Sequence, residues 1–118
     1  NISESCSKDA KFFTLRSFKE FIVIAHNRHR NSLAGGSIPN HKSASRMGTV
    51  SWDDDLSYLS SLNVKRCKFG LDQCRNTEKF RASGQNIAKT LWDTRGSAIS
   101  NLQTQIDKWF NEYKFSNM

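Results

Sequence analysis

Three stretches of the sequence repeat apolar residues at helical spacing, and this periodicity constrains the fold more than any other feature. The first follows Ser17, which has capping-box spacing to Glu20, and ends at Gly35-Gly36. The second begins between Ser51 and Asp53, and the third follows the turn-like residues 95–97. We therefore predict three amphipathic helices. Their apolar stripes are Phe18, Phe21, Ile22, Ala25, His29 and Leu33; Trp52, Leu56, Leu59, Leu62 and Cys67; and Ile99, Leu102, Ile106, Trp109 and Tyr113.

Sheet-forming sequence is scarce between these helices. Residues 1–16 are polar and irregular, and Gly70 is expected to interrupt the second helix. Residues 68–83 are predicted to form a long basic loop anchored at Cys74, and residues 84–89 to form a strand or a short helical turn. Three apolar helix faces then have at most one or two strands to pack on. This imbalance indicates that a piece of the fold is missing.

Length and charge narrow the class of protein. The chain has 118 residues, the size of one small domain, and its 25% charged and 11% aromatic content argues against disorder. Its longest apolar run, residues 21–25, is far below the roughly 20 residues of a transmembrane helix. The net charge of +7 suits anionic partners, but for charge alone we favour a basic surface that only contacts solvent. We find no nucleic-acid-binding motif.

The cysteine count of three is odd for a chain with disulfide bonds. It leaves a free thiol, an intermolecular bond or a missing partner as alternatives. Cys67 and Cys74 do not form a C-x-x-C pair and have no second pair or nearby histidines, which argues against a structural zinc site. Disulfide formation is the better interpretation, and it predicts an oxidising compartment.

Five segments of the chain carry recognisable motifs. They are, in order, His26-Asn27-Arg28-His29-Arg30, residues 47–56 (MGTVSWDDDL), residues 62–67 with 72–77, Gly84-Gln85-Asn86-Ile87-Ala88, and Trp109-Phe110-Asn111-Glu112-Tyr113. Together these segments resemble the CAP superfamily of cysteine-rich secretory proteins, antigen 5 and pathogenesis-related proteins. The cysteine segments and the G-Q-N-hydrophobic-A pattern are most similar to its insect antigen 5 branch.

The resemblance implies an α+β fold of the CAP type, an α-β-α sandwich, with residues 1–118 as a single partial CAP (SCP) domain. It also implies secretion and a salivary or venom origin in an insect. In the antigen 5 pattern Cys6 pairs with Cys67, and the partner of Cys74 lies upstream of Asn1. The family continues beyond the W-x-x-E helix into a G-H-F-T-Q segment and further strands. We therefore expect this chain to be truncated at both ends.

The resemblance also locates a remnant of the family's cleft, in which two histidines and two acidic residues can hold a divalent metal. Leu71 stands at the first histidine position and Gln85 at the first acidic position, while Glu112 matches the second acid. The second histidine belongs to the absent segment. Leu71 offers no lone pair and Gln85 is neutral, so we predict no metal, no cofactor and no acid–base catalysis at this cleft.

His26 and His29 are three residues apart on the first predicted helix. They could form a metal-binding or catalytic pair, but no third ligand has suitable spacing. We favour the alternative that each ring is hydrogen-bonded to nearby backbone or carboxylate groups.

Basic residues surround the cysteine segment. They form an anionic-binding patch for heparan-like glycosaminoglycans or lipid head groups, or they are simply solvated, and the two interpretations have equal weight. The residues concerned are Lys65, Arg66, Lys68, Arg75, Lys79 and Arg81.

Taken with the resemblance, these features predict a secreted, non-enzymatic binding protein. Its ligands would be lipids such as sterols, fatty acids or eicosanoids, or biogenic amines, held against apolar helix faces. The alternatives are a residual hydrolase, against which Leu71 and Gln85 argue, and an allergen-like remnant with no independent activity.

Overall fold

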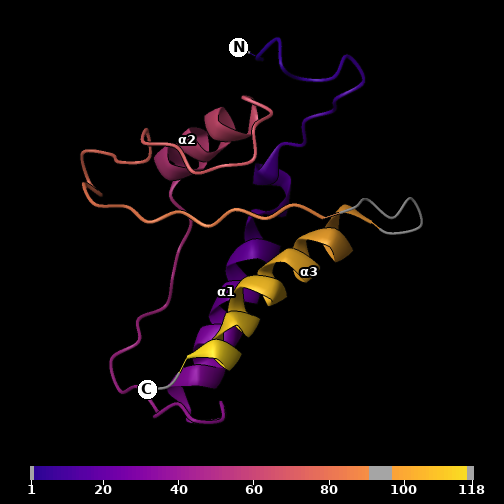
Figure 1. Ribbon diagram of the computed structural model, residues 1–118. Helices are drawn as coiled ribbons and strands as arrows, with labels where there is room; N and C mark the ends of the chain where they lie inside the picture. The colour runs from indigo at the N-terminus through magenta and orange to yellow at the C-terminus, as the bar shows by residue number, and fades with distance from the viewer. Residues whose placement is uncertain (1, 91–96, 117–118) are drawn as a thin grey trace. The chain divides into compact units, whose positions relative to one another are not determined.

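The computed structural model describes residues 2–90 and 97–116. Within these ranges it has three α-helices, α1 (Lys19–Ala34), α2 (Asp54–Val64) and α3 (Ala98–Phe110), and two 3₁₀ segments, η1 (Leu15–Phe18) and η2 (Asn111–Phe115) (Figure 1). The three predicted helices are confirmed. The described residues contain no β-strand, and the strand or helical turn predicted at residues 84–89 is wrong, because this segment is irregular.

The chain divides into two compact units, which we describe separately. The disulfide unit comprises Asn1–Ser17 and Trp52–Lys89, and the helix-pair unit comprises Phe18–Ser51 and Thr90–Met118. The assignment of the whole chain to a single partial domain is not tested by this division and stays a prediction.

In the helix-pair unit α1 and α3 lie side by side and run in the same direction (Figure 1). Their contact buries Ala25 and Ile106, which are only 3% and 4% exposed. Ile24 is not part of the apolar stripe predicted for α1, and it is accordingly 55% exposed. The stripe predicted for α3 includes one residue too many at its N-terminal end, however, because Ile99 is exposed.

The ends of these two helices differ in how well the sequence predicts them. Ser97 caps α3 by accepting a 3.1 Å hydrogen bond from Ser100 N. The capping box predicted at Ser17 is wrong, because Phe18 is the N-cap of α1 and makes no side-chain capping bond. At the other end α1 stops at Gly35-Gly36 as expected, and Gly36 adopts φ +80°, which glycine tolerates best.

In the disulfide unit the N-cap of α2, Asp53, lies within the range predicted for the start of this helix. Asp53 caps it by accepting a 2.9 Å hydrogen bond from Leu56 N. The helix ends at Val64, before Gly70, so the predicted interruption at Gly70 is wrong. Tight turns replace the last helical turn, since Arg66 N donates to Asn63 O and Cys67, at φ +54°, donates to Val64 O.

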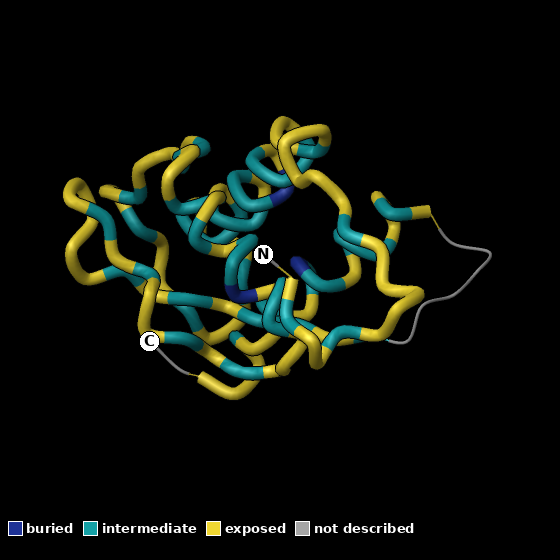
Figure 2. Tube along the Cα trace, turned by 90° about the horizontal axis from the view of Figure 1, so that it is seen from above, coloured by how far each residue is buried: buried dark blue, intermediate teal, exposed yellow. Residues whose placement is uncertain are grey.

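Most of the described chain is half-buried or exposed (Figure 2). Asn63 is the polar exception in the disulfide unit, at 7% exposure. Several large apolar side chains are well exposed, including Tyr58, Phe69 and Leu71. Loops in this unit are therefore fixed mainly by polar contacts, which are described next.

Candidate functional site

Two of the three remnant-cleft positions lie in the disulfide unit, close to Asp72. Leu71 is 55% exposed and presents only apolar atoms. Gln85 is half-buried and forms a reciprocal pair with Asp72: its Oε1 accepts from Asp72 N at 3.0 Å, and its Nε2 donates to Asp72 Oδ1 at 3.1 Å. The amide group that replaces the family's carboxylate is thus engaged at both its donor and its acceptor.

Glu112 is the third remnant-cleft position, and it lies on η2 in the helix-pair unit with an exposed side chain. The structure brings Leu71 and Gln85 into one loop system but does not test whether Glu112 shares a cleft with them. The three-residue cleft remains a prediction.

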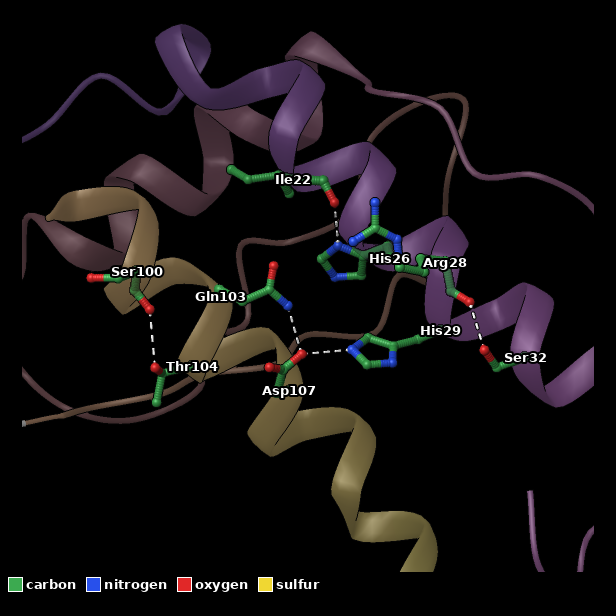
Figure 3. Close-up of polar contacts among 9 residues, drawn as sticks. All are labelled: Ile22, His26, Arg28, His29, Ser32, Ser100, Gln103, Thr104 and Asp107. Carbon is green, nitrogen blue, oxygen red and sulfur yellow. Dashed lines mark hydrogen bonds and ion pairs between the residues drawn. The ribbon is translucent and has the colours of Figure 1, made fainter. Parts of the chain in front are cut away.

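The histidines of α1 are hydrogen-bonded in the two ways that the structural interpretation predicted (Figure 3). His26 Nδ1 donates to the carbonyl of Ile22 at 2.8 Å, one turn earlier in the helix. His29 Nε2 donates to Asp107 Oδ1 at 2.7 Å. Among the described residues, no group of three or more His, Cys, Asp or Glu side chains is placed to hold a metal ion.

His29 and Asp107 also join α1 to α3. The same Asp107 Oδ1 accepts from Gln103 Nε2 at 2.6 Å, so two donors converge on one carboxylate oxygen (Figure 3). The His29 ring stacks on Phe110, with centroids 4.1 Å apart. This arrangement gives His29 Nε2 and Asp107 Oδ1 hydrogen-bond partners and packs the imidazole ring, which is how a structural contact between helices is built.

His41 has a geometry that resembles part of a hydrolytic site. Its Nδ1 lies 2.8 Å from Pro39 O, and its Nε2 lies 2.9 Å from Ser116 Oγ. Hydrolytic sites place a nucleophile beside a histidine base whose other nitrogen is oriented by an acceptor. Here Ser116 would be the nucleophile, His41 the base and Pro39 O the acceptor. Ser116 Oγ also lies 3.2 Å from Tyr113 O, and Tyr113 meets the His41 ring edge-on at 5.8 Å. We interpret the set as a tether for the end of η2.

The H-N-x-x-R residues of α1 hold a segment that follows the helix. Asn27 Nδ2 donates to Val50 O at 3.0 Å, and Asn27 Oδ1 accepts from Val50 N at 2.8 Å. Arg30 donates to Gly48 O at 2.8 Å. These contacts give the motif a structural role that its sequence alone did not reveal.

The structure contains a disulfide bond between Cys6 and Cys67, the pair that the resemblance implied, with Cα atoms 5.1 Å apart. Ser3 N donates to Lys65 O beside it and helps hold the N-terminal segment against the end of α2. Cys74 is a free, exposed cysteine. Within this chain the loop is held by the Asp72–Gln85 pair and by arginines, and the anchoring role of Cys74 stays a prediction.

Three of the six residues in the predicted anionic-binding patch donate to backbone carbonyls, and one of them, Arg81, does so only through a long 3.5 Å contact with Glu78 O. Arg66 donates to Asn63 Oδ1 at 2.9 Å and to Gly70 O at 3.1 Å. Arg75 donates to Ser83 O at 3.0 Å and to Asp72 O at 2.9 Å. Lys68, Lys79 and Arg81 are exposed, while Lys65 is half-buried. The structure thus divides the patch into two bracing arginines and a group of more accessible cations.

The family profile described as "CAP: Cysteine-rich secretory protein family" matches residues 23–118, most of the chain. The chain belongs to this family. All five CAP-type segments identified from the sequence lie within the matched range. In the described part of this CAP chain, no helix is long and apolar enough to cross a membrane.

Curated relatives of this CAP chain are antigen 5 and venom allergen proteins. "Antigen 5 like allergen Cul n 1" of Culicoides nubeculosus is 40% identical over 95% of this chain and 51% of its own length. "Venom allergen-1" of Aedes albopictus is 37% identical over 93% and 43%, and "Venom allergen 5.02" of Dolichovespula maculata is 35% identical over 84% and 47%. The chain thus spans about half the length of these relatives. No solved structure gives a significant match.

The sequence located Leu71 and Gln85 only through the CAP resemblance, and it missed Asp72. No periodic pattern links Asp72 to Gln85, because both lie in irregular chain. The one available signal was Asp72 itself, an acidic residue directly after Leu71 in a loop that is otherwise rich in basic residues.

Proposed function

We propose that this CAP chain is part of a secreted, salivary or venom-type antigen 5-like protein that acts by binding and not by catalysis. The observation that carries the proposal is the reciprocal Asp72–Gln85 pair. A group that serves as an acid, a base or a metal ligand needs an available proton or lone pair. The Gln85 amide has no titratable proton, and its contacts with Asp72 occupy both of its ends.

Leu71 supports the same conclusion, because an exposed leucine cannot replace a histidine in proton transfer or metal binding. The printed names of the relatives support the antigen 5 assignment by analogy. The α-β-α sandwich belongs to this proposal as well. Apolar side chains that remain exposed on all three helices, such as Ile24, Tyr58 and Ile99, favour further layers of structure against them.

The ligand class follows from the apolar side chains that would line a cavity between these helices and such further layers. A small hydrophobic molecule, such as a sterol, fatty acid or eicosanoid, or an amphipathic biogenic amine would gain from contact with them. Anionic host surfaces are a second candidate, favoured by the exposed cations Lys68, Lys79 and Arg81. A glycosaminoglycan is one such surface.

Three kinds of measurement on the purified protein separate binding from catalysis. We expect no stoichiometric zinc uptake by calorimetry and no turnover in general protease and esterase assays, since Leu71 and Gln85 supply neither ligand nor base. Mass spectrometry of an organic extract should identify a co-purified lipid or amine. Micromolar zinc binding that is lost in Glu112→Ala, or hydrolysis that this substitution abolishes, would contradict the non-enzymatic role.

A further inference from the structure

A short closed turn projects from the disulfide unit between Asn76 and Ser83. Thr77 N donates to Phe80 O at 2.8 Å, and Phe80 N donates to Thr77 Oγ1 at 2.9 Å. Ser83 N donates to Asn76 Oδ1 at 2.9 Å and closes the base of the turn. We call residues 78–82 the basic tip. Its backbone is fixed by these bonds, so it presents its side chains without a large further loss of conformational entropy.

Every residue of the basic tip is exposed. Lys79 and Arg81 flank Phe80, whose side chain is 39% exposed, and Lys79 Nζ lies 5.3 Å from the centre of the Phe80 ring. Glu78 is the one acidic residue in the tip. Arg81 Nε makes only a long contact, 3.5 Å, with Glu78 O. Two cations and an aromatic ring are therefore displayed together on a rigid turn.

The basic tip differs from the neighbouring arginines. Arg66 and Arg75 donate to backbone carbonyls of their own loops, and their removal would disturb the fold. An exposed cation is also next to an exposed phenylalanine in the sequence at Lys68 and Phe69, where Phe69 is 63% exposed. A loop that only needed solvent would not benefit from exposed aromatic rings beside its charges.

We propose that the basic tip docks on the surface of an anionic phospholipid bilayer. The cations attract the head groups, and the Phe80 ring enters the apolar boundary beneath them, so that both kinds of side chain gain. A glycosaminoglycan has no apolar layer to receive Phe80, and this is why the lipid surface is the better fit. The inference rests on the proposed binding role and names a partner for it.

Co-sedimentation with lipid vesicles tests this proposal on the purified protein. We expect binding to vesicles of phosphatidylcholine with phosphatidylserine and much weaker binding to phosphatidylcholine alone. Lys79→Glu with Arg81→Glu should weaken binding by at least about 30-fold, because each basic residue near such a surface contributes about 1 kcal/mol and the two new carboxylates are also repelled by it. Phe80→Ser, which keeps both charges, should weaken it about tenfold.

A charge-matched control is available in the same unit. Lys8 and Lys11 are exposed, so Lys8→Glu with Lys11→Glu changes the net charge equally but leaves the tip intact. We expect this control to lose less than fivefold. Equal losses in both charge variants, or an unaffected Phe80→Ser, would overturn the proposal. Retention on heparin without any vesicle binding would also overturn the proposal of membrane docking, but it would leave the proposed binding to anionic surfaces in place. Hydrolytic activity would contradict only the proposed non-enzymatic function.

Discussion

Amide side chains fix loops at several places in the described part of this protein. Asn27 bonds both the N–H and the C=O of Val50, Gln85 bonds the N–H and the carboxylate of Asp72, and the buried Asn63 donates to Gly70 O. An amide carries a donor and an acceptor side by side, so it can satisfy two complementary groups at once. A carboxylate of the same shape has no donor. The identity of these residues is therefore set by their partners.

The Asp72–Gln85 pair gives a prediction at the residue scale. Gln85→Glu should lower the free energy of unfolding by about 1–3 kcal/mol, because it removes one hydrogen bond and places two carboxylates in contact. Adding Asp72→Asn should restore most of the loss, since the pair then forms with its donor and acceptor exchanged. Urea unfolding followed by circular dichroism measures both effects.

Gln73→Glu is the matched control, because Gln73 is exposed in the same loop and the substitution makes the same chemical change. It should alter stability by less than about 0.5 kcal/mol. If the double variant is no more stable than Gln85→Glu alone, the two side chains do not form the pair.

These contacts show where inference from sequence stops at the residue scale. Gln85 and Asn27 were both found through motifs, but their partners were not. The Asp72 and Val50 partners lie in segments without regular structure, so no helical or strand period brings them into register. Their proximity depends on the path of the folded chain.

At the scale of elements, the contact between α1 and α3 depends on one polar residue within an apolar stripe. His29 donates to Asp107 and stacks on Phe110, so hydrogen bonding and packing can be separated by substitution. His29→Phe keeps an aromatic ring and should cost about 1–2 kcal/mol for the lost hydrogen bond to a charged group. His29→Ala should cost more, because it also leaves a gap against Phe110.

Arg28→Ala is the control for these variants, since Arg28 is exposed on the same helix. Chemical denaturation should place it within about 0.5 kcal/mol of the parent protein. Equal stability of His29→Phe and the parent would mean that the bond to Asp107 contributes nothing to the helix contact.

Helices were predictable because their apolar periodicity is local, but their first residues were less so. Ser17-x-x-Glu20 and Ser97 both look like N-caps in the sequence, and only Ser97 is one. Ser17 N already donates to Thr14 O, which draws Ser17 into η1 and starts the helical path one turn early. A cap needs a free, extended residue, and the preceding turn decides whether it exists.

At the scale of the whole molecule, the Cys6–Cys67 disulfide links positions 61 residues apart in the sequence. In the chain-entropy model, closing a loop of this length stabilises the folded state by about 4 kcal/mol. Cys6→Ser with Cys67→Ser should lose stability on this order in thermal or urea unfolding. Cys74→Ser, which removes the free thiol, should change it little.

The division into two units was the least predictable feature at this scale. Each unit combines an early segment of the chain with a late one. The unit boundaries fall near Ser17 and Ser51, where the sequence predicted only the starts of helices. Composition indicated one small domain, because length and charge carry no information about which distant segments meet. Hydrogen bonds such as Ser3 N to Lys65 O supply that information.

The same disulfide makes residues 6–67 a covalent ring, and the ring contains all of α1. A single cut by a protease anywhere between these cysteines would open the ring without dividing the protein into two molecules. The exposed residues that connect α1 to α2 could therefore be nicked, and the pieces would stay joined until a reductant reached the bond.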